Sequence, residues 1–188
     1  AYRRQRQMCI RDSTSTAIGE AMLKIVLVFA ELERNMTSER VTATMISRAN
    51  NGQWNGGRIP FGYSYDSGTS TFSIREGEAV VCRRLKDLYL DNKSLVYTAR
   101  ALNADGYKTR AGADWTPTAV WIIASSPFYA GIYRYNRYKG TENRTLNPEE
   151  EWVMIPDHHP AIFTLEEHEA MKLSLIHISE PTRLALIS

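Results

Sequence analysis

The stretch from Ile18 to Asn50 constrains the fold most, because its pattern predicts one uninterrupted helix. At 1.5 Å per residue this helix would be roughly 45 to 50 Å long, which exceeds the width of a small domain. Ser15 or Thr16 can cap its start, and the sequence NNG at 50–52 can end it.

The two halves of the predicted helix differ in chemistry. Residues 21–30, AMLKIVLVFA, are apolar around almost the whole circumference, which is typical of a helix covered by other parts of a protein or by a partner. Residues 30–40, AELERNMTSER, carry two Glu-Arg pairs and keep only a narrow apolar stripe. We therefore expect the apolar half to be packed in a core, and the charged half to project from that core over another part of the protein or a partner.

Both ends of the chain carry sequences that indicate a common, non-native origin. MCIRDS, residues 8–13, can be encoded by ATG TGT ATA AGA GAC AGC. The reverse complement of all but the last base, CTG TCT CTT ATA CAC AT, reads LSLIHI, residues 173–178. This inverted repeat resembles a translated sequencing adapter; the alternative is a native basic arm and a native apolar tail. We therefore assign 1–13 and 173–188 to adapter and exclude them from the fold argument.

Charge and cysteine content limit the function classes. Residues 34–144 hold 16 Lys and Arg against 9 Asp and Glu, whereas 149–169 hold seven acids and no Lys or Arg. A net-positive body suits a polyanionic partner, although such a surface is also found simply solvated. Cys82 is the only cysteine outside the adapter segments, which excludes an intrachain disulfide and a cysteine-based zinc site. This cysteine usage is consistent with a cytoplasmic setting. No membrane span is expected, because Lys24 interrupts the longest apolar run.

The segment 51–64, NGQWNGGRIPFGYS, is rich in glycine and predicts an extended, bending connector. A strand of this kind with one arginine can enter a narrow DNA minor groove, where the negative potential is deepest. Arg58 is the candidate for that contact. The alternative is a packed hairpin in which Pro60 and Tyr63 begin the next domain.

The rest of the native sequence predicts a mainly α domain with small β elements, an α+β fold class. Helices are expected at 78–91, with Val80, Val81, Leu85 and Leu88 inward, at 94–106, with Val96, Ala99 and Leu102 inward, and at 116–125. Strand-like alternation follows at 132–135 and 152–155, and then a helix capped by Thr164. Short helices joined by tight turns are typical of helix-turn-helix DNA readers, although many small helical domains share this order.

Residues 14–40 carry a more specific signal, because TSTAIGEAMLKIVLVFAELERNMTSER resembles the end of the catalytic domain of serine site-specific recombinases, the resolvase/invertase superfamily. The pattern there is S-T-P-x-G, an apolar stretch, A-E-x-E-R and a second E-R; Ala17 replaces the usual proline. The resemblance implies that the apolar half of the helix contacts other subunits and that the charged half crosses the minor groove.

The remaining motifs resemble the recombinase domain of the large serine recombinases, the serine integrase type. G-G-x-x-P-x-G-Y matches residues 56–63, A-x-x-L-N-x-x-G matches 99–106, T-x-x-G-x-x-W matches 109–115 and P-x-Y-x-G matches 127–131. One departure is that Trp121 and Ile122 stand where relatives often carry basic residues. The resemblance divides the chain into the catalytic-domain helix at 14–50, the connector at 51–64 and a DNA-binding recombinase domain at 65–172.

The resemblance also implies a chemistry, namely DNA recombination and integration in a mobile genetic element. Family members cut DNA with a serine that forms a phosphoserine link, so strand exchange requires no cofactor. Glu33 and Arg34 match positions that border that active site, while the nucleophile lies upstream of this helix. We therefore expect this chain to bind double-stranded DNA at attachment-type sites without cutting it, and the intact parent to act as a homodimer or tetramer.

The candidate DNA-binding residues combine the cations of the positive body with two positions on the helix at 116–125. For the cations the alternative is a solvated surface, and for Trp121 it is a surface or core role. The candidates are Arg40, Arg48, Arg58, Lys108, Arg110, Thr118, Trp121, Arg134, Arg137 and Lys139.

Three alternatives remain open on the sequence alone. His158 and His159 suggest a metal site, but without cysteines or a carboxylate at ligand spacing we predict a loop and no metal. The whole chain is also compatible with a non-enzymatic helix-turn-helix regulator. A third possibility is an interaction domain that dimerises through a coiled coil, although sustained heptads are absent.

Overall fold

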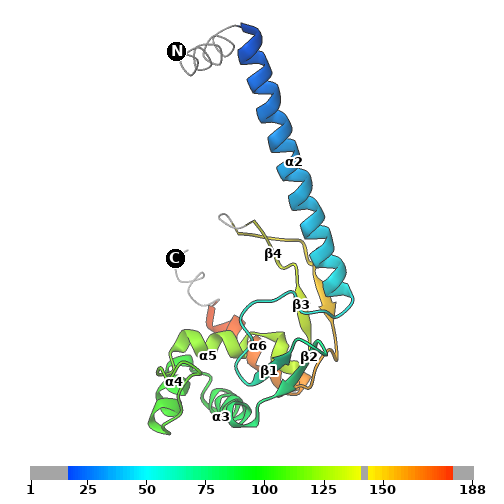
Figure 1. Cartoon of the computed structure of the whole chain (residues 1–188). Coiled ribbons are helices and arrows are strands. Elements are labelled where there is room, and N and C mark those ends of the chain that lie inside the picture. The colour runs from blue at the N-terminus through cyan, green and yellow to red at the C-terminus, as the bar shows by residue number, and fades with distance from the viewer. Residues whose placement is uncertain (1–16, 141–143, 180–188) are drawn as a thin grey trace, which may run out of the picture. The chain divides into compact units, whose positions relative to one another are not determined.

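A computed structural model describes residues 17–140 and 144–179. The chain divides into two compact units between Ser47 and Arg48 (Figure 1). Among the described helices, none combines the length and the apolar character that crossing a membrane requires.

The first unit consists of most of helix α2, Ala17–Asn50. The predicted long helix is therefore confirmed, and it ends at the NNG sequence, where Gly52 has a φ of +71° and its amide donates to the carbonyl of Ala49. The proposed caps Ser15 and Thr16 lie outside the described residues. The apolar side chains of residues 22–29 are exposed in the structure, so the cover that the all-round apolar pattern predicts stays a prediction.

Three short helices open the second unit: α3, Glu76–Asn92; α4, Leu95–Ala104; and α5, Pro117–Ala124. The predicted caps are confirmed, because the side chains of Ser94 and Thr116 accept hydrogen bonds from the amides of Tyr97 and Ala119. Helix α3 packs on α4 and α4 packs on α5.

Two residues predicted to face inward do not. Val80 on α3 and Val96 on α4 are 49% and 48% exposed, whereas Leu85 and Leu102 are fully buried. Each of these short helices packs through a narrow face, which Ala79, Val81, Cys82 and Leu85 form on α3 and Thr98, Ala99 and Leu102 form on α4. An isolated valine beside such a face stays in solvent.

Three two-stranded antiparallel sheets complete the unit. Strand β1 (Tyr63–Asp66) pairs with β2 (Thr71–Ile74), β3 (Tyr133–Tyr135) with β6 (Val153–Ile155), and β4 (Tyr138–Lys139) with β5 (Thr145–Leu146). The β3–β6 pair matches the predicted strand alternation. The β1–β2 hairpin begins at Tyr63, as the alternative interpretation of the connector predicted, whereas residues 53–60 form no strand.

Helix α6, Leu165–Ser179, closes the described chain, after the 3-10 turns η1 (Pro127–Ala130) and η2 (Glu149–Glu151). It begins with the expected Thr164 cap, whose hydroxyl accepts from the amide of Glu167 at 3.2 Å while Glu167 accepts from the amide of Thr164 at 2.8 Å. Residues 173–179, which the inverted repeat assigns to adapter, continue this helix, and Ser174 is buried. The other assigned adapter residues, 1–13 and 180–188, lie outside the described residues.

The core of the second unit is built from aromatic rings. Tyr63 is fully buried and its ring contacts those of Phe72, Phe128, Tyr129 and His159, with centroids 5.1 to 6.4 Å apart. Its hydroxyl donates to the carbonyl of Pro160 at 3.0 Å. These contacts join the first strand of the unit to the segment before α6, so residues almost a hundred positions apart form one core.

Candidate nucleic-acid interface

The connector is held against the rest of the second unit at both of its ends. Near its start, Trp54 packs on Phe72 at 5.2 Å and on Tyr133 at 5.8 Å between ring centroids. Near its end, Gly62 and Tyr63 are buried. Between these anchors, Gly56, Gly57 and Arg58 are exposed. The connector is therefore a fixed loop that presents one arginine.

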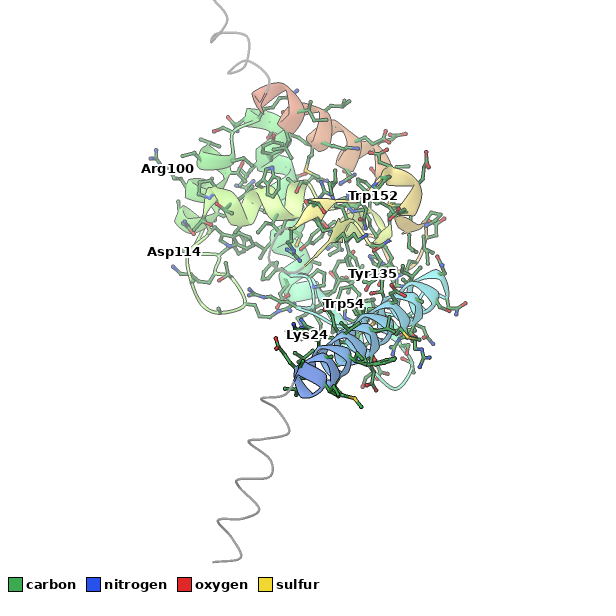
Figure 2. All side chains as sticks on the ribbon, turned by 90° about the horizontal axis from the view of Figure 1, so that it is seen from above. Lys24, Trp54, Arg100, Asp114, Tyr135 and Trp152 are labelled. Carbon is green, nitrogen blue, oxygen red and sulfur yellow. The ribbon has the colours of Figure 1, made fainter. Side chains whose placement is uncertain are left out.

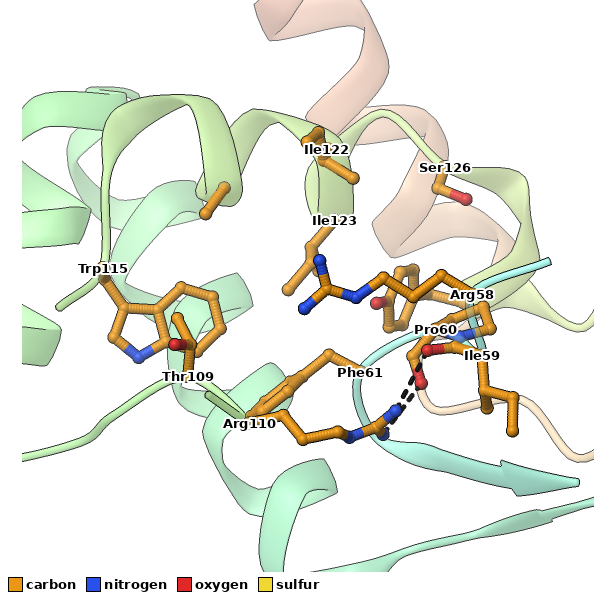
Figure 3. A pocket seen from close by; sticks show the side chains of 12 residues that line it. Arg58, Ile59, Pro60, Phe61, Thr109, Arg110, Trp115, Ile122, Ile123 and Ser126 are labelled. Carbon is orange, nitrogen blue, oxygen red and sulfur yellow. Dashed lines mark hydrogen bonds between the residues drawn. The ribbon is translucent and has the colours of Figure 1, made fainter. Parts of the chain in front are cut away.

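Arg58 has an uncommitted guanidinium. It makes no hydrogen bond or ion pair with another described residue, and it reaches across a cavity of about 360 Å³ (Figure 3). The connector, the 109–115 turn and α5 line this cavity, chiefly through Phe61, Trp115, Ile122, Ile123 and Tyr129. The lining contains no carboxylate, imidazole or thiol, so it has no acid-base pair for catalysis.

The helix α5 presents a mixed face beside this cavity. Thr118, Trp121 and Ile122 stand at helical spacing and are exposed, whereas Val120 and Ile123 are buried. Its 48% exposure excludes a core role for Trp121 and leaves the surface role and the DNA contact open. An exposed indole beside a threonine can stack or contact a thymine methyl group.

Two predicted cations are paired with carboxylates. Lys108 forms an ion pair with Asp114 on the exposed turn before α5. Arg110 bonds to Glu78 of α3, and this hydrogen bond raises the pKa of the Arg110 guanidinium. Arg100 and Asp114 stand at the edge of the unit (Figure 2).

The other predicted cations of the second unit make no ion pair with a described residue. Arg48 is exposed and donates to the carbonyl of Trp54 at 3.4 Å. Lys139 is exposed on β4. Like Arg58, these side chains retain positive charge that no described carboxylate neutralises.

Arg134 and Arg137 are instead stacked on an aromatic ring. Their guanidinium carbons lie 5.7 and 5.6 Å from the ring centroid of Trp152, and Arg137 also lies 5.1 Å from the centroid of Tyr138. Burial lowers the pKa of Arg134, and the nearby Arg137 charge lowers it further. The Nε of Arg137 is buried and has no hydrogen-bond partner among the described residues.

The sequence did not single out Trp152 or Arg144. Arg144 directly precedes β5, and its guanidinium carbon lies 5.6 Å from the ring centroid of Tyr138 on β4. The available signal was the interleaving of Arg and aromatic residues in YRYNRYK, residues 133–139, but the partner Trp152 lies on a distant segment.

The candidates on α2 are all exposed. Glu33, Arg34 and Arg40 make no ion pair with another described residue. The described part of α2 therefore offers charges for a partner and no assembled catalytic cluster.

The two adjacent histidines serve the fold. The Nε2 of His158 lies 2.7 Å from the carbonyl oxygen of Gly52, and the Nε2 of His159 lies 2.6 Å from that of Phe128. Burial lowers the pKa of His159 to about 4. Across residues 17–140 and 144–179, no group of three or more His, Cys, Asp and Glu residues could hold a metal ion.

The cysteine is chemically quiet. Cys82 is fully buried in α3, and burial raises the pKa of its thiol to about 12. The group therefore stays protonated and is a poor nucleophile or metal ligand at neutral pH.

Comparison with known proteins agrees with the motifs. Residues 76–175 match the family model Recombinase, and residues 4–54 match the model Resolvase, N terminal domain. The first match covers more than half of the chain, so the chain belongs to the recombinase family. Its combination with a resolvase domain confirms the predicted resemblance to the large serine recombinases. The resolvase match begins inside the segment assigned to adapter.

Two solved structures share the fold. One is the crystal structure of an LSR–DNA complex, with a TM-score of 0.56 and 18% identity over 75% of this chain and 39% of that chain. The other concerns the sequence requirements of the Listeria innocua prophage attP site, with a TM-score of 0.54 and 19% identity over 73% of this chain and 51% of that chain. This chain thus spans about two fifths to one half of those proteins.

Proposed function

We propose that this chain is the DNA-gripping part of a serine site-specific recombinase. The observation that carries this proposal is the set of cations in the second unit without a carboxylate partner among the described residues. The exposed Arg58 on a fixed loop suits the narrow minor groove. Arg134, Arg137 and Lys139 on β3 and the segment after it suit the phosphate backbone, which attracts such charges whatever the sequence.

Helix α2 would have two partners. Its apolar half would bind another subunit, because a patch that includes Val26 and Phe29 is too large to remain in water without cost. Its charged half, with Arg40 and the junction residue Arg48, would lie along the minor groove. The intact parent would then act as a dimer or tetramer on attachment-type sites.

Base contacts would come from α5. Thr118 and Trp121 are exposed on the same face, and a short helix of this length can enter a major groove. The short helices and their turns would then act as a helix-turn-helix DNA reader.

The chain itself would bind DNA without cutting it. The parent reaction needs a serine activated for attack on phosphorus by a neighbouring base. Ser38 on α2 is exposed, and its hydroxyl is bonded to no carboxylate or imidazole among the described residues. Glu33 and Arg34 would represent only the border of the catalytic site. A protein band covalently attached to nicked plasmid DNA would contradict this proposal.

Salt-dependent binding to a labelled duplex tests the DNA proposal directly. The logarithm of the association constant should fall linearly with the logarithm of salt concentration, by about 0.9 for each phosphate contacted. Arg58→Gln should weaken binding and lower the slope by about that amount. Arg83→Gln is the matched control, because Arg83 is paired with Glu76 on α3. Wild-type binding that does not respond to salt would overturn the proposal.

The non-enzymatic regulator remains the alternative function. The resolvase-domain match over residues 4–54 favours the recombinase, because a regulator built only on the recombinase domain has no need of that segment.

A further inference from the structure

Arg110 was a candidate for phosphate contact, but its hydrogen bonds lead into the protein. Its Nη1 donates to the carbonyl of Ile59 at 3.0 Å, and its Nη2 donates to the carbonyls of Pro60 at 3.1 Å and Tyr63 at 3.0 Å. Figure 3 shows the guanidinium bonded to the first two of these carbonyls. One arginine of the 109–115 turn thus holds three backbone carbonyls at the end of the connector.

Glu78 of α3 completes the arrangement from the other side. It accepts from the Nε of Arg110 at 2.9 Å and from the backbone amide of Gly62 at 2.7 Å. Its side chain is 15% exposed and that of Arg110 is 29% exposed. Burial alone would raise the pKa of Glu78, but the hydrogen bonds from Arg110 and Gly62 outweigh burial and lower it.

The connector is tightly packed at Gly62, the residue whose amide Glu78 binds. A Cβ atom on Gly62 would lie 2.8 Å from Cδ1 of Ile162 and 3.2 Å from Sγ of Cys82, and the φ of Gly62 is +92°. A side chain is therefore disfavoured both by space and by backbone conformation. The backbone, and not a side chain, is what Glu78 and Arg110 grip.

All three nitrogens of Arg110 donate to protein acceptors, and a carboxylate neutralises its charge. A phosphate would have to compete with five hydrogen bonds inside the protein, of which two go to a charged partner. Arg58, by contrast, lies immediately before the gripped segment and has no such partner.

We propose that Arg110 and Glu78 form a clamp that positions the connector, so that Arg58 is presented to the minor groove, and that Arg110 does not itself bind phosphate. This inference rests on the proposed DNA-binding function. It changes Arg110 from a contact residue into a positioning residue and adds Glu78, an acid that no charge argument would place in a DNA-binding site.

The test compares Arg110→Gln, Glu78→Gln and the double variant in the full chain, with DNA affinity measured across a range of salt concentrations. A clamp requires both partners, so each single variant should lose about tenfold in affinity and the double variant should be no worse than either. The two single variants should lower the salt slope equally, and by no more than the value of about 0.9 expected for Arg58→Gln, because both act by releasing Arg58 from its contact. Arg110→Lys should behave like Arg110→Gln, since an ammonium keeps the charge but lacks the planar fork.

Glu76→Gln and Arg83→Gln are the matched controls, because they break an exposed ion pair on the same helix. Both should bind within about twofold of wild type. The clamp is wrong if Arg110→Gln lowers the salt slope by about 0.9 while Glu78→Gln binds as tightly as wild type or tighter, which is the signature of a direct phosphate contact. It is equally wrong if both variants bind like wild type.

Hydrogen exchange at the Gly62 amide separates this inference from the proposed function. Both single variants should expose this amide while the amides of α3 keep their protection, which shows a local release of the connector in a folded domain. If wild-type protein shows no salt-dependent DNA affinity, the proposed function fails, and the clamp then stands or falls on this amide alone.

Discussion

Helix α2 and the second unit are both rich in apolar residues, but these residues are exposed in the helix and largely buried in the second unit. In α2, Leu27 and Phe29 are 67% and 65% exposed, whereas in the second unit Tyr63 and Tyr89 have no exposed surface. The second unit buries many of its apolar groups among rings from several segments, including β1, β2 and η1. The first half of α2 is apolar around its circumference, and no other described element of its own unit covers it. Apolar content therefore shows how much surface needs a cover, and only topology shows whether the chain supplies that cover itself.

The sharpest way to break this comparison is to remove one ring from the second unit. Tyr63→Ala should destabilise that unit by about 3 to 5 kcal/mol, because a fully buried ring leaves a cavity among rigid neighbours. Tyr63→Phe should cost only about 1 kcal/mol, since it removes only the hydrogen bond to Pro160. Urea unfolding followed by tryptophan fluorescence measures both. If Val26→Ala on α2 costs the second unit as much as Tyr63→Ala, the two regions are not different in kind.

The next effect concerns α2 alone. Replacing Val26 and Phe29 together by Gln should weaken self-association, because each apolar side chain buried at a subunit contact contributes roughly 1.5 to 3 kcal/mol. The dissociation constant should therefore rise by about a hundredfold or more, and sedimentation velocity over a range of concentrations would show it. Asn35→Gln, on the exposed charged half, is the control. A wild-type chain that stays monomeric at every concentration would contradict the proposed subunit contact.

The same contrast explains what the sequence could predict. The long helix, the caps at Ser94, Thr116 and Thr164, and the β3–β6 pair follow from local patterns that the chain satisfies locally. The stacking of Arg134 on Trp152 and the grip of Arg110 on the connector join distant segments, and no local pattern encodes them.

Net charge does not distinguish Arg58 from Arg110, because both are arginines in a net-positive body. Only the structure shows that Glu78, a single acid in that body, occupies the guanidinium of Arg110 and leaves that of Arg58 unpaired among the described residues. Residue type predicts the chemistry that is available, whereas packing decides which of it is already used.

Acid should weaken the second unit in a specific pH range. The folded pKa of His159 is about 4, lowered from 6.5 by burial, so the unfolded chain takes up a proton on this ring before the folded one does. The stability due to the neutral ring is therefore fully present above pH 6.5 and is lost as the pH falls towards 4. His168, whose pKa burial also lowers, adds to the same trend.

Urea midpoints measured at a series of pH values test this expectation. His159→Gln, which can still donate to the carbonyl of Phe128, should flatten the curve between pH 6.5 and 4 and leave the part due to His168. An unchanged pH profile in this variant would show that His159 is not the group that titrates.

The smallest expected effect compares one ion pair from each region. Glu20 and Lys24 on α2 lie 3.0 Å apart with side chains 66% and 71% exposed, whereas Glu167 and Lys86 lie 2.6 Å apart with side chains 31% and 15% exposed. Solvent screens the first pair, so its coupling free energy should be at most about 0.5 kcal/mol. The second pair lies between α6 and α3 and should reach about 1 to 2 kcal/mol, as expected for a hydrogen bond between charged groups.

Double-mutant cycles based on urea unfolding would measure both couplings, with Glu→Gln and Lys→Met as the single changes. Glu167→Gln preserves an acceptor for the amide of Thr164, so the capping interaction of α6 remains and only the charge is removed. Equal couplings in the two pairs would mean that solvent screens charges in the second unit as strongly as on an isolated helix. The difference between the self-covered domain and the uncovered helix would then hold for apolar groups only.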